Sequence, residues 1–330
     1  MITHSINLLH QLRYPTGLFA AAQKTVKTGY SKAWLRDNIY ATLGIEALGQ
    51  YASVLPTYHA ILDILLKHES KIDWMIKQPH PKHAYRYIHA RYDPHTGDEF
   101  HEEWGNKQND AIGLLLFKIG ELSKRIPVLR DEHDLRIVQK LVDYLAAIEY
   151  WHDTDNGMWE EAEEVHASSI GACVAGLIAV QHLVRVPSEI IEAGKQVLTT
   201  LLPNESATKD CDLALLSLIY PYNVVTPGQR EAILANVEQN LLRERGVIRY
   251  KNDNYYSNGN DAEWTMGLPW LAIIYKQLGQ MNKYRYFLEK SLAAMNDKGE
   301  LPELYYGNTS VHNENTPLGW AQSLFVVASI

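Results

Sequence analysis

The stretch DNGMWEE at residues 155–161 is followed, after a short gap, by ASSIGACVAGLIAV at residues 167–180. The second segment is apolar on all sides of a helix, and such a helix must be buried. The first sets carboxylates beside a tryptophan, which suits sugar chemistry, because an indole face stacks on a pyranose ring and a carboxylic acid among apolar neighbours can protonate a glycosidic oxygen. Aromatic and acidic residues before a helix are also ordinary capping features, so a purely structural role stays open.

Helical periodicity extends in both directions from this stretch. Apolar residues recur every three to four positions along the chain, and no convincing set of alternating strands is present. The pattern predicts twelve helices, at residues 2–12, 36–50, 53–78, 107–125, 130–151, 165–183, 187–202, 209–220, 226–243, 261–278, 280–295 and 317–330.

The connections between these helices alternate in character. The even-numbered helices follow long connections rich in Trp, Tyr, Gly and carboxylates, whereas most odd-numbered ones follow short connections such as residues 50–52. This alternation predicts an all-α toroid, a closed ring of helix pairs with inner and outer layers. The long connections then gather at the N-terminal ends of the inner helices, where unpaired N–H groups favour bound hydroxyls and carboxylates. No Pro/Gly/Ser-rich linker interrupts the pattern, which predicts a single domain over residues 1–330.

Composition limits the classes of partner. The formal net charge is −8 without long runs of like charge, so we expect no nucleic acid and no membrane as partner, and an uncharged ligand fits better. The N-terminus lacks the pattern of a leader and no segment is apolar enough for a membrane span, which predicts a cytoplasmic protein. Cys173 and Cys211 lie in apolar helical segments and are expected as free thiols. The histidines show no metal-binding spacing, so no metal or other cofactor is expected.

Candidate binding residues lie in the long connections. Arg36 and Asp37 offer donors and acceptors for neighbouring sugar hydroxyls, and Trp104 offers a stacking face. Each also has a structural interpretation, as a helix cap, a surface arginine or a buried tryptophan. Glycoside hydrolysis needs two carboxyl groups, one as acid and the other as base or nucleophile. Glu160 and Glu303, in different loops of the expected rim, are the pair that we select.

Several short motifs occur in these loops in a specific order. They are Trp34-Leu35-Arg36-Asp37, Trp104-x-x-x-Gln108-x-Asp110, Asp155-x-Gly157-x-Trp159-Glu160, Pro302-Glu303 and Trp320-x-Gln322-Ser323. Together they make the chain resemble the glucoamylase family, glycoside hydrolase family 15. The chain also resembles, nearly end to end, the N-terminal region of the phosphorylase b kinase alpha and beta regulatory subunits.

The resemblance implies an (α/α)6 toroid of the six-hairpin glycosidase type, which removes a terminal glucose from an α-glucoside with inversion. It implies Glu160 as general acid and Glu303 as general base, with the two carboxyl groups about 6.5–9.5 Å apart. The expected substrate-binding residues, taken from the resemblance and from the neighbouring rim positions, are Trp34, Arg36, Asp37, Trp104, Gln108, Asp110, Trp159, Glu161, Arg249, Glu263 and Trp320.

Two functions remain open at the level of the sequence. An enzyme of this kind would act on a small soluble α-gluco-oligosaccharide, such as a maltose- or isomaltose-like sugar, because the sequence shows no starch-binding module. The alternative is a non-catalytic sugar-binding or regulatory module that uses the same pocket, as in the kinase subunits. The acidic residues 161–164 have no counterpart in the family pattern and can narrow the pocket.

Overall fold

The computed structural model describes residues 1–102 and 104–330. Within these residues the α-helices are α1 (Ile2–Leu12), α2 (Leu35–Ala47), α3 (Tyr51–Lys67), α4 (Glu69–Lys77), α5 (Asn109–Leu122), α6 (Glu132–Ala147), α7 (Ala167–Val180), α8 (Ser188–Leu201), α9 (Pro227–Asn236), α10 (Gly267–Gln277), α11 (Met281–Ala293) and α12 (Gly319–Ser329). Shorter helical turns are η1 (Ala84–Arg86), η2 (Leu213–Leu218) and η3 (Val237–Leu241). The strands form two antiparallel pairs, β1 (Ala33–Trp34) with β2 (Arg91–Tyr92) and β3 (Glu263–Trp264) with β4 (Leu304–Tyr305).

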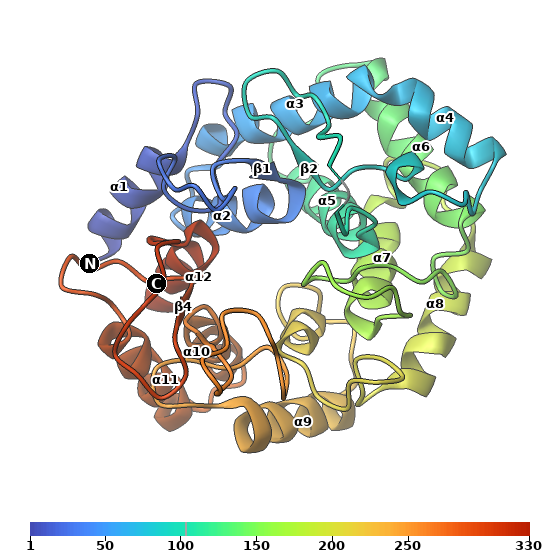
Figure 1. The fold of residues 1–330 in the computed structure, drawn as a ribbon. Helices are drawn as coiled ribbons and strands as arrows, with labels where there is room; N and C mark the ends of the chain where they lie inside the picture. Colours follow the sequence, from blue (N-terminus) through green and yellow to red (C-terminus); the bar gives the residue numbers. More distant parts are fainter. Residues whose placement is uncertain (103) are drawn as a thin grey trace.

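The helices close into a ring with two layers (Figure 1). The inner layer consists of α2, α5, α7, α10 and α12, with η2 in the place between α7 and α10. The outer layer consists of α1, α3, α4, α6, α8, α9 and α11. Nearly every residue of α5 and α7 is buried, whereas α6 buries one face only. The predicted (α/α)6 toroid is confirmed, and its even-numbered predicted helices are the inner ones.

Three predicted helices differ from the observed ones. The segment predicted at 53–78 is broken at His68, which leaves the helical conformation with φ −98° and ψ 15° and whose ring contacts the carbonyl oxygen of Gly97 at 2.9 Å. The segment predicted at 209–220 is helical only in the 3-10 turn η2, which begins after Asp212, whose carboxylate accepts from the backbone N–H of Ala214. The segment predicted at 261–278 begins with β3, since residues 263–264 pair with β4 instead of continuing α10.

None of the helices within the described residues combines the length and the hydrophobicity that crossing a membrane requires. The two cysteines are free, as expected.

The contact between α5 and α7 depends on small residues. A Cβ atom on Gly113 of α5 would lie 2.4 Å from the backbone of Ala172 and Cys173, and one on Gly176 of α7 would lie 2.4 Å from the carbonyl oxygen of Gly113. Only glycine therefore allows the two helix backbones to approach this closely. The contact matters for the rim, because the loops that begin α5 and α7 carry the polar residues described below.

Gly113→Ala is expected to lower the free energy of unfolding by about 3 kcal/mol, since the new methyl group meets rigid helix backbone and must push the helices apart. Unfolding in urea measures the effect. Gly228→Ala in α9 is the control, because no described atom lies within 4 Å of the added Cβ there. That control should be neutral or stabilising by up to about 1 kcal/mol. Equal effects of the two substitutions would contradict the close-approach explanation.

Candidate functional site

A cavity of about 230 Å³, here called the central pocket, opens among the loops that precede the inner helices. The expected site residues that line it are Trp34, Arg36, Asp37, Trp104, Trp159, Glu160, Arg249 and Trp320. Further lining residues are Ala21, Thr28, Tyr30, Arg91, Met158, Tyr255, Trp264 and Leu318. Segments far apart in the sequence thus meet at one rim, as the alternation of connections predicted.

Glu160 presents its carboxyl group to this pocket. Its Oε2 accepts a hydrogen bond of 2.8 Å from Trp104 Nε1, and its Oε1 lies 3.5 Å from Arg36 Nη2. Burial raises the pKa of Glu160 to about 7, although the positive charge of Arg36 acts in the opposite direction. About a quarter of the side chain, 23%, remains exposed, so the group can be reached from the pocket. A carboxylic acid that keeps its proton near neutral pH can serve as a proton donor.

The backbone of Glu160 is strained. Its φ is +64°, in the left-handed region that residues with a side chain rarely adopt. Gly157 in the same loop also has a positive φ, of +62°, and a Cβ there would lie 2.8 Å from the ring of His166. The loop packs tightly on His166 at Gly157, and Glu160 adopts a conformation that costs free energy, as is frequent at functional sites.

A buried polar cluster supports this loop from below. Asp155 accepts hydrogen bonds of 2.8 Å from the backbone N–H of Asn109 and from the hydroxyl of Ser169, which join the loop to the starts of α5 and α7. Burial raises the pKa of Asp155 to about 7. Burial lowers the pKa of His166, but hydrogen bonding to Glu205 and the charge of Asp155 outweigh it and raise this pKa to about 9. His166 is therefore a cation at neutral pH.

Glu303 has a different environment. It is fully buried and receives hydrogen bonds from Tyr30 and Tyr255 on Oε1 and from Asn313 and Asn315 on Oε2. Burial raises its pKa, while the hydrogen bonds from Tyr30, Asn315 and Asn313 oppose this rise, because donors stabilise the ionised form. Glu303 does not line the central pocket itself, but Tyr30 and Tyr255 do, so the side chains that hold Glu303 line the same space as Glu160.

Arg36 joins several of the expected site residues. Its Nη1 donates to Gln108 at 2.9 Å and to Asp110 at 3.0 Å, while Nη2 faces Glu160. Asp110 is fully buried, and neither Asp110 nor Gln108 lines the central pocket. Both therefore hold the guanidinium group of Arg36 in place from behind. Beside Arg36, burial raises the pKa of Asp37 to about 6.

Arg249 and Glu161 form a second charged group at the pocket. Glu161 Oε1 accepts hydrogen bonds of 3.0 Å from Arg249 and 2.6 Å from Tyr250, and Oε2 accepts one of 2.7 Å from Lys209. Arg249 lines the pocket, whereas Glu161 does not. Glu161 thus connects three of the rim loops and positions Arg249.

Two expectations for acidic residues change with the structure. Glu263 is buried away from the pocket, and its carboxylate accepts from the backbone N–H groups of Arg245 at 2.7 Å and Asn308 at 3.0 Å, so it holds loops together. The carboxylates of residues 161–164 are also engaged: Glu163 lies 3.6 Å from Lys107, and Glu164 accepts from Thr208 at 2.6 Å. These residues do not line the central pocket and so do not narrow it directly.

Sequence reasoning missed Tyr30, Tyr255, Arg91 and Trp264 as pocket residues. Tyr30 lies shortly before the Trp34 motif, and Tyr255 lies in a loop already noted for its aromatic residues. That composition is the only sequence signal for them. Tyr30 and Tyr255 contact Glu303, and Arg91 contacts Trp104, with its Cζ 4.0 Å from the centroid of the Trp104 ring. These contacts join separate segments of the chain.

The two-layered ring of helices with acidic and aromatic residues at one rim defines a glycosidase-like toroid. The chain belongs to glycosyl hydrolases family 15, whose family model matches residues 1–191.

Among solved structures, one titled "Glycosidase Wild Type" shares 21% identity and a TM-score of 0.84 over 99% of this chain and 95% of its own. A glucoamylase from Saccharomycopsis fibuligera shares 13% identity and a TM-score of 0.67 over 99% of this chain and 92% of its own. At these identities the structures show a common fold.

Curated relatives carry a different description. The chain is 27% identical to a Caenorhabditis elegans protein named "Probable phosphorylase b kinase regulatory subunit alpha", over 89% of this chain and 30% of that protein. It is 23% identical to the skeletal muscle isoform of the alpha regulatory subunit from Mus musculus, over 100% of this chain and 32% of that protein. The chain therefore spans about a third of the length of these relatives.

Proposed function

We propose that this chain is an inverting, exo-acting glycoside hydrolase that releases glucose from the non-reducing end of small α-glucosides. The observation that carries the proposal is the contrast between Glu160, which lines the central pocket, and Glu303, which is held by two tyrosines that line it. Burial raises the pKa of both carboxyl groups, to about 7 for Glu160. Glu160 has one short hydrogen bond, from Trp104, whereas hydrogen bonds from Tyr30, Asn315 and Asn313 oppose the rise at Glu303. Carboxyl groups whose environments separate their pKa values take the roles of acid and base.

In the proposed reaction, Glu160 donates its proton to the glycosidic oxygen as the bond from that oxygen to the anomeric carbon breaks. A water molecule attacks the anomeric carbon from the opposite face, and Glu303 takes a proton from it. The products are glucose with inverted configuration and the shortened leaving group. Tyr30 and Tyr255 orient Glu303 and present their hydroxyls to the pocket.

The size and lining of the central pocket support a single sugar ring as occupant. Its volume of about 230 Å³ is below the range of about 300–1,000 Å³ that is common for drug-sized ligands. Aromatic side chains such as Trp34 and Trp320 line it together with the charged side chains of Arg36 and Asp37. Aromatic faces and charged groups of this kind suit a sugar ring and its hydroxyls.

A second candidate is a sugar-binding regulatory module, which the names of the curated relatives favour. A solved glycosidase variant with the same fold was determined in complex with glucose, which supports a sugar as ligand under either candidate. The two candidates share the pocket and differ only in turnover.

Incubation with a panel of α-linked glucose disaccharides, followed by NMR, separates them. The hydrolase should release glucose that appears first as the β-anomer, because inversion at an α-linkage gives that configuration. Release of α-glucose first would exclude inversion. Sugar binding without turnover at any pH from about 4 to 8 would favour the regulatory module and overturn the proposed hydrolase.

A further inference from the structure

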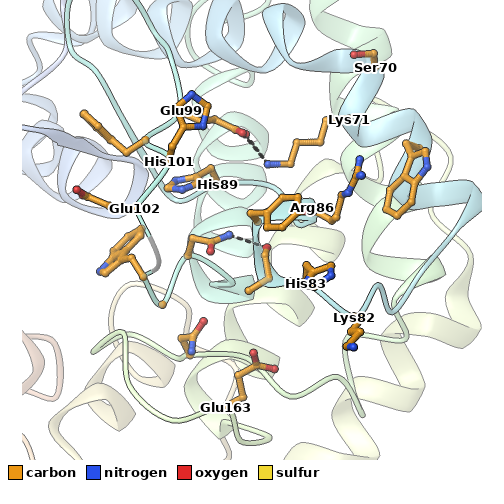
Figure 2. A pocket seen from close by; sticks show the side chains of 18 residues that line it. Ser70, Lys71, Lys82, His83, Arg86, His89, Glu99, His101, Glu102 and Glu163 are labelled. Carbon is orange, nitrogen blue, oxygen red and sulfur yellow. Dashed lines mark hydrogen bonds and ion pairs between the residues drawn. The ribbon is translucent and has the colours of Figure 1, made fainter.

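A second and larger cavity of about 1040 Å³ shares Trp104 with the central pocket (Figure 2). Its walls come from α4, from η1 and the residues just before it, and from residues on both sides of Trp104. We call it the side pocket. Neither the proposed reaction nor the family resemblance uses its charged residues.

Two of the three carboxylates of the side pocket are neutralised by close ion pairs. Each of the three that line it has a cationic partner: Lys71 at 2.7 Å for Glu99, Lys32 at 2.6 Å and Arg91 for Glu102, and Lys107 at 3.6 Å for Glu163. Figure 2 shows the pair of Lys71 and Glu99 on the upper wall. Additional cations in this pocket therefore find Glu99 and Glu102 already paired, whereas Glu163 shares Lys107 with Asp153, which lies closer to this lysine at 2.8 Å.

Two such cations are present. Arg86 and Lys82 line the pocket and pair with no carboxylate among residues 1–102 and 104–330. Arg86 Cζ lies 5.0 Å from the centroid of the Trp74 ring and 5.4 Å from that of the Tyr85 ring, while the residue stays exposed and none of its side-chain N–H groups bonds a described atom. Burial lowers the pKa of Lys71, and the positive charge of Arg86 also lowers it, because the two cations lie close together.

The side pocket also offers flat surfaces. Tyr85 is 58% exposed, and the His83 ring stacks on it at 5.3 Å with an interplanar angle of 14°. An exposed aromatic face can stack on a sugar ring, and an arginine without an ion-pair partner can bind a phosphate group through two N–H groups. The side pocket offers both.

We infer that the side pocket binds a phosphorylated sugar, with the phosphate on Arg86 and the sugar ring against Tyr85. An uncharged oligosaccharide would leave the Arg86 fork without an anion, and free phosphate would leave the aromatic faces unused. This site is separate from the central pocket and does not depend on the proposed hydrolysis.

Isothermal titration of the whole chain with glucose 6-phosphate and with inorganic phosphate tests the inference, in the presence of saturating glucose to occupy the central pocket. We expect glucose 6-phosphate to bind more tightly than inorganic phosphate, and its binding to weaken as salt is added. Arg86→Ala should weaken glucose 6-phosphate at least about tenfold, and Arg86→Lys should weaken it less, because lysine keeps the charge and loses the fork.

Two further variants complete the design. Arg285→Ala on α11 removes another exposed arginine, outside the side pocket, and should leave binding unchanged. Tyr85→Ala should weaken glucose 6-phosphate and leave inorganic phosphate unchanged. Both Arg86 and Tyr85 are exposed, so melting temperatures should show that these variants fold.

Three results would overturn the inference: no binding of glucose 6-phosphate at millimolar concentration, equal affinity for glucose 6-phosphate and inorganic phosphate, or binding that Arg86→Ala does not weaken. A failure of the proposed hydrolase is distinguishable, because it would appear as missing turnover in the NMR assay while the response to Arg86→Ala stayed as expected.

Discussion

Glu160→Gln is expected to lower kcat at least about a hundredfold while sugar binding is kept, because the amide preserves the shape of the side chain and cannot donate a proton as an acid. The amide oxygen can still accept from Trp104 Nε1, so the pocket should stay intact. Initial rates of glucose release and titration with a disaccharide measure the two effects separately. Glu289→Gln on the exposed face of α11 is the control and should retain full activity.

The pH profile gives a sharper form of this prediction. As a general acid, Glu160 must be protonated, so kcat/KM should fall as the pH rises through the pKa of about 7. Above that pH the fall should approach tenfold per pH unit. Near-normal turnover by Glu160→Gln, or a wild-type profile that stays flat from pH about 6 to 9, would remove Glu160 from the role of acid.

Arg36→Met is expected to lower the free energy of unfolding by about 3–5 kcal/mol, because it leaves Asp110 without its cation in a fully buried position. The double variant Arg36→Met, Asp110→Leu should regain much of this loss, since an apolar pair of similar volume replaces a buried ion pair at little cost. Unfolding in urea measures both, and the comparison does not depend on any activity.

The matched control for Arg36 is an exposed ion pair. Lys67 and Asp98 are 2.5 Å apart, with 44% and 59% of their side chains exposed. Lys67→Met should therefore cost no more than about 1 kcal/mol. If Arg36→Met lowered the free energy of unfolding as little as Lys67→Met, the positive charge of Arg36 would not be needed to stabilise the buried carboxylate of Asp110.

The sequence allowed the ring and much of the pocket to be predicted because both depend on chain connectivity. Loops before alternate helices converge once the ring closes, so Trp34, Arg36, Trp104 and Glu160 could be assigned to one rim without any knowledge of their contacts. Helix boundaries were less predictable. The pairing of β3 with β4 outweighed the helical pattern around residue 263.

Composition could not distinguish residues that face the pocket from residues that support it. Asp110 and Glu263 are carboxylates in the right loops, yet both are buried behind the residues that line the pocket. Tyr30 could not be assigned, because its bond to Glu303 joins residues 273 positions apart in the chain. Such pairs become visible only when the tertiary structure is known.

The left-handed backbone at Glu160 bears on how this position can change over evolutionary time. A residue with a side chain in that region costs about 1–2 kcal/mol relative to glycine, so stability alone favours replacing the glutamate. A lineage that kept the fold but no longer needed a proton donor would be free to accept glycine or asparagine at position 160 and would gain stability. The glutamate found here carries that cost, which is what the proposed role of Glu160 as proton donor predicts.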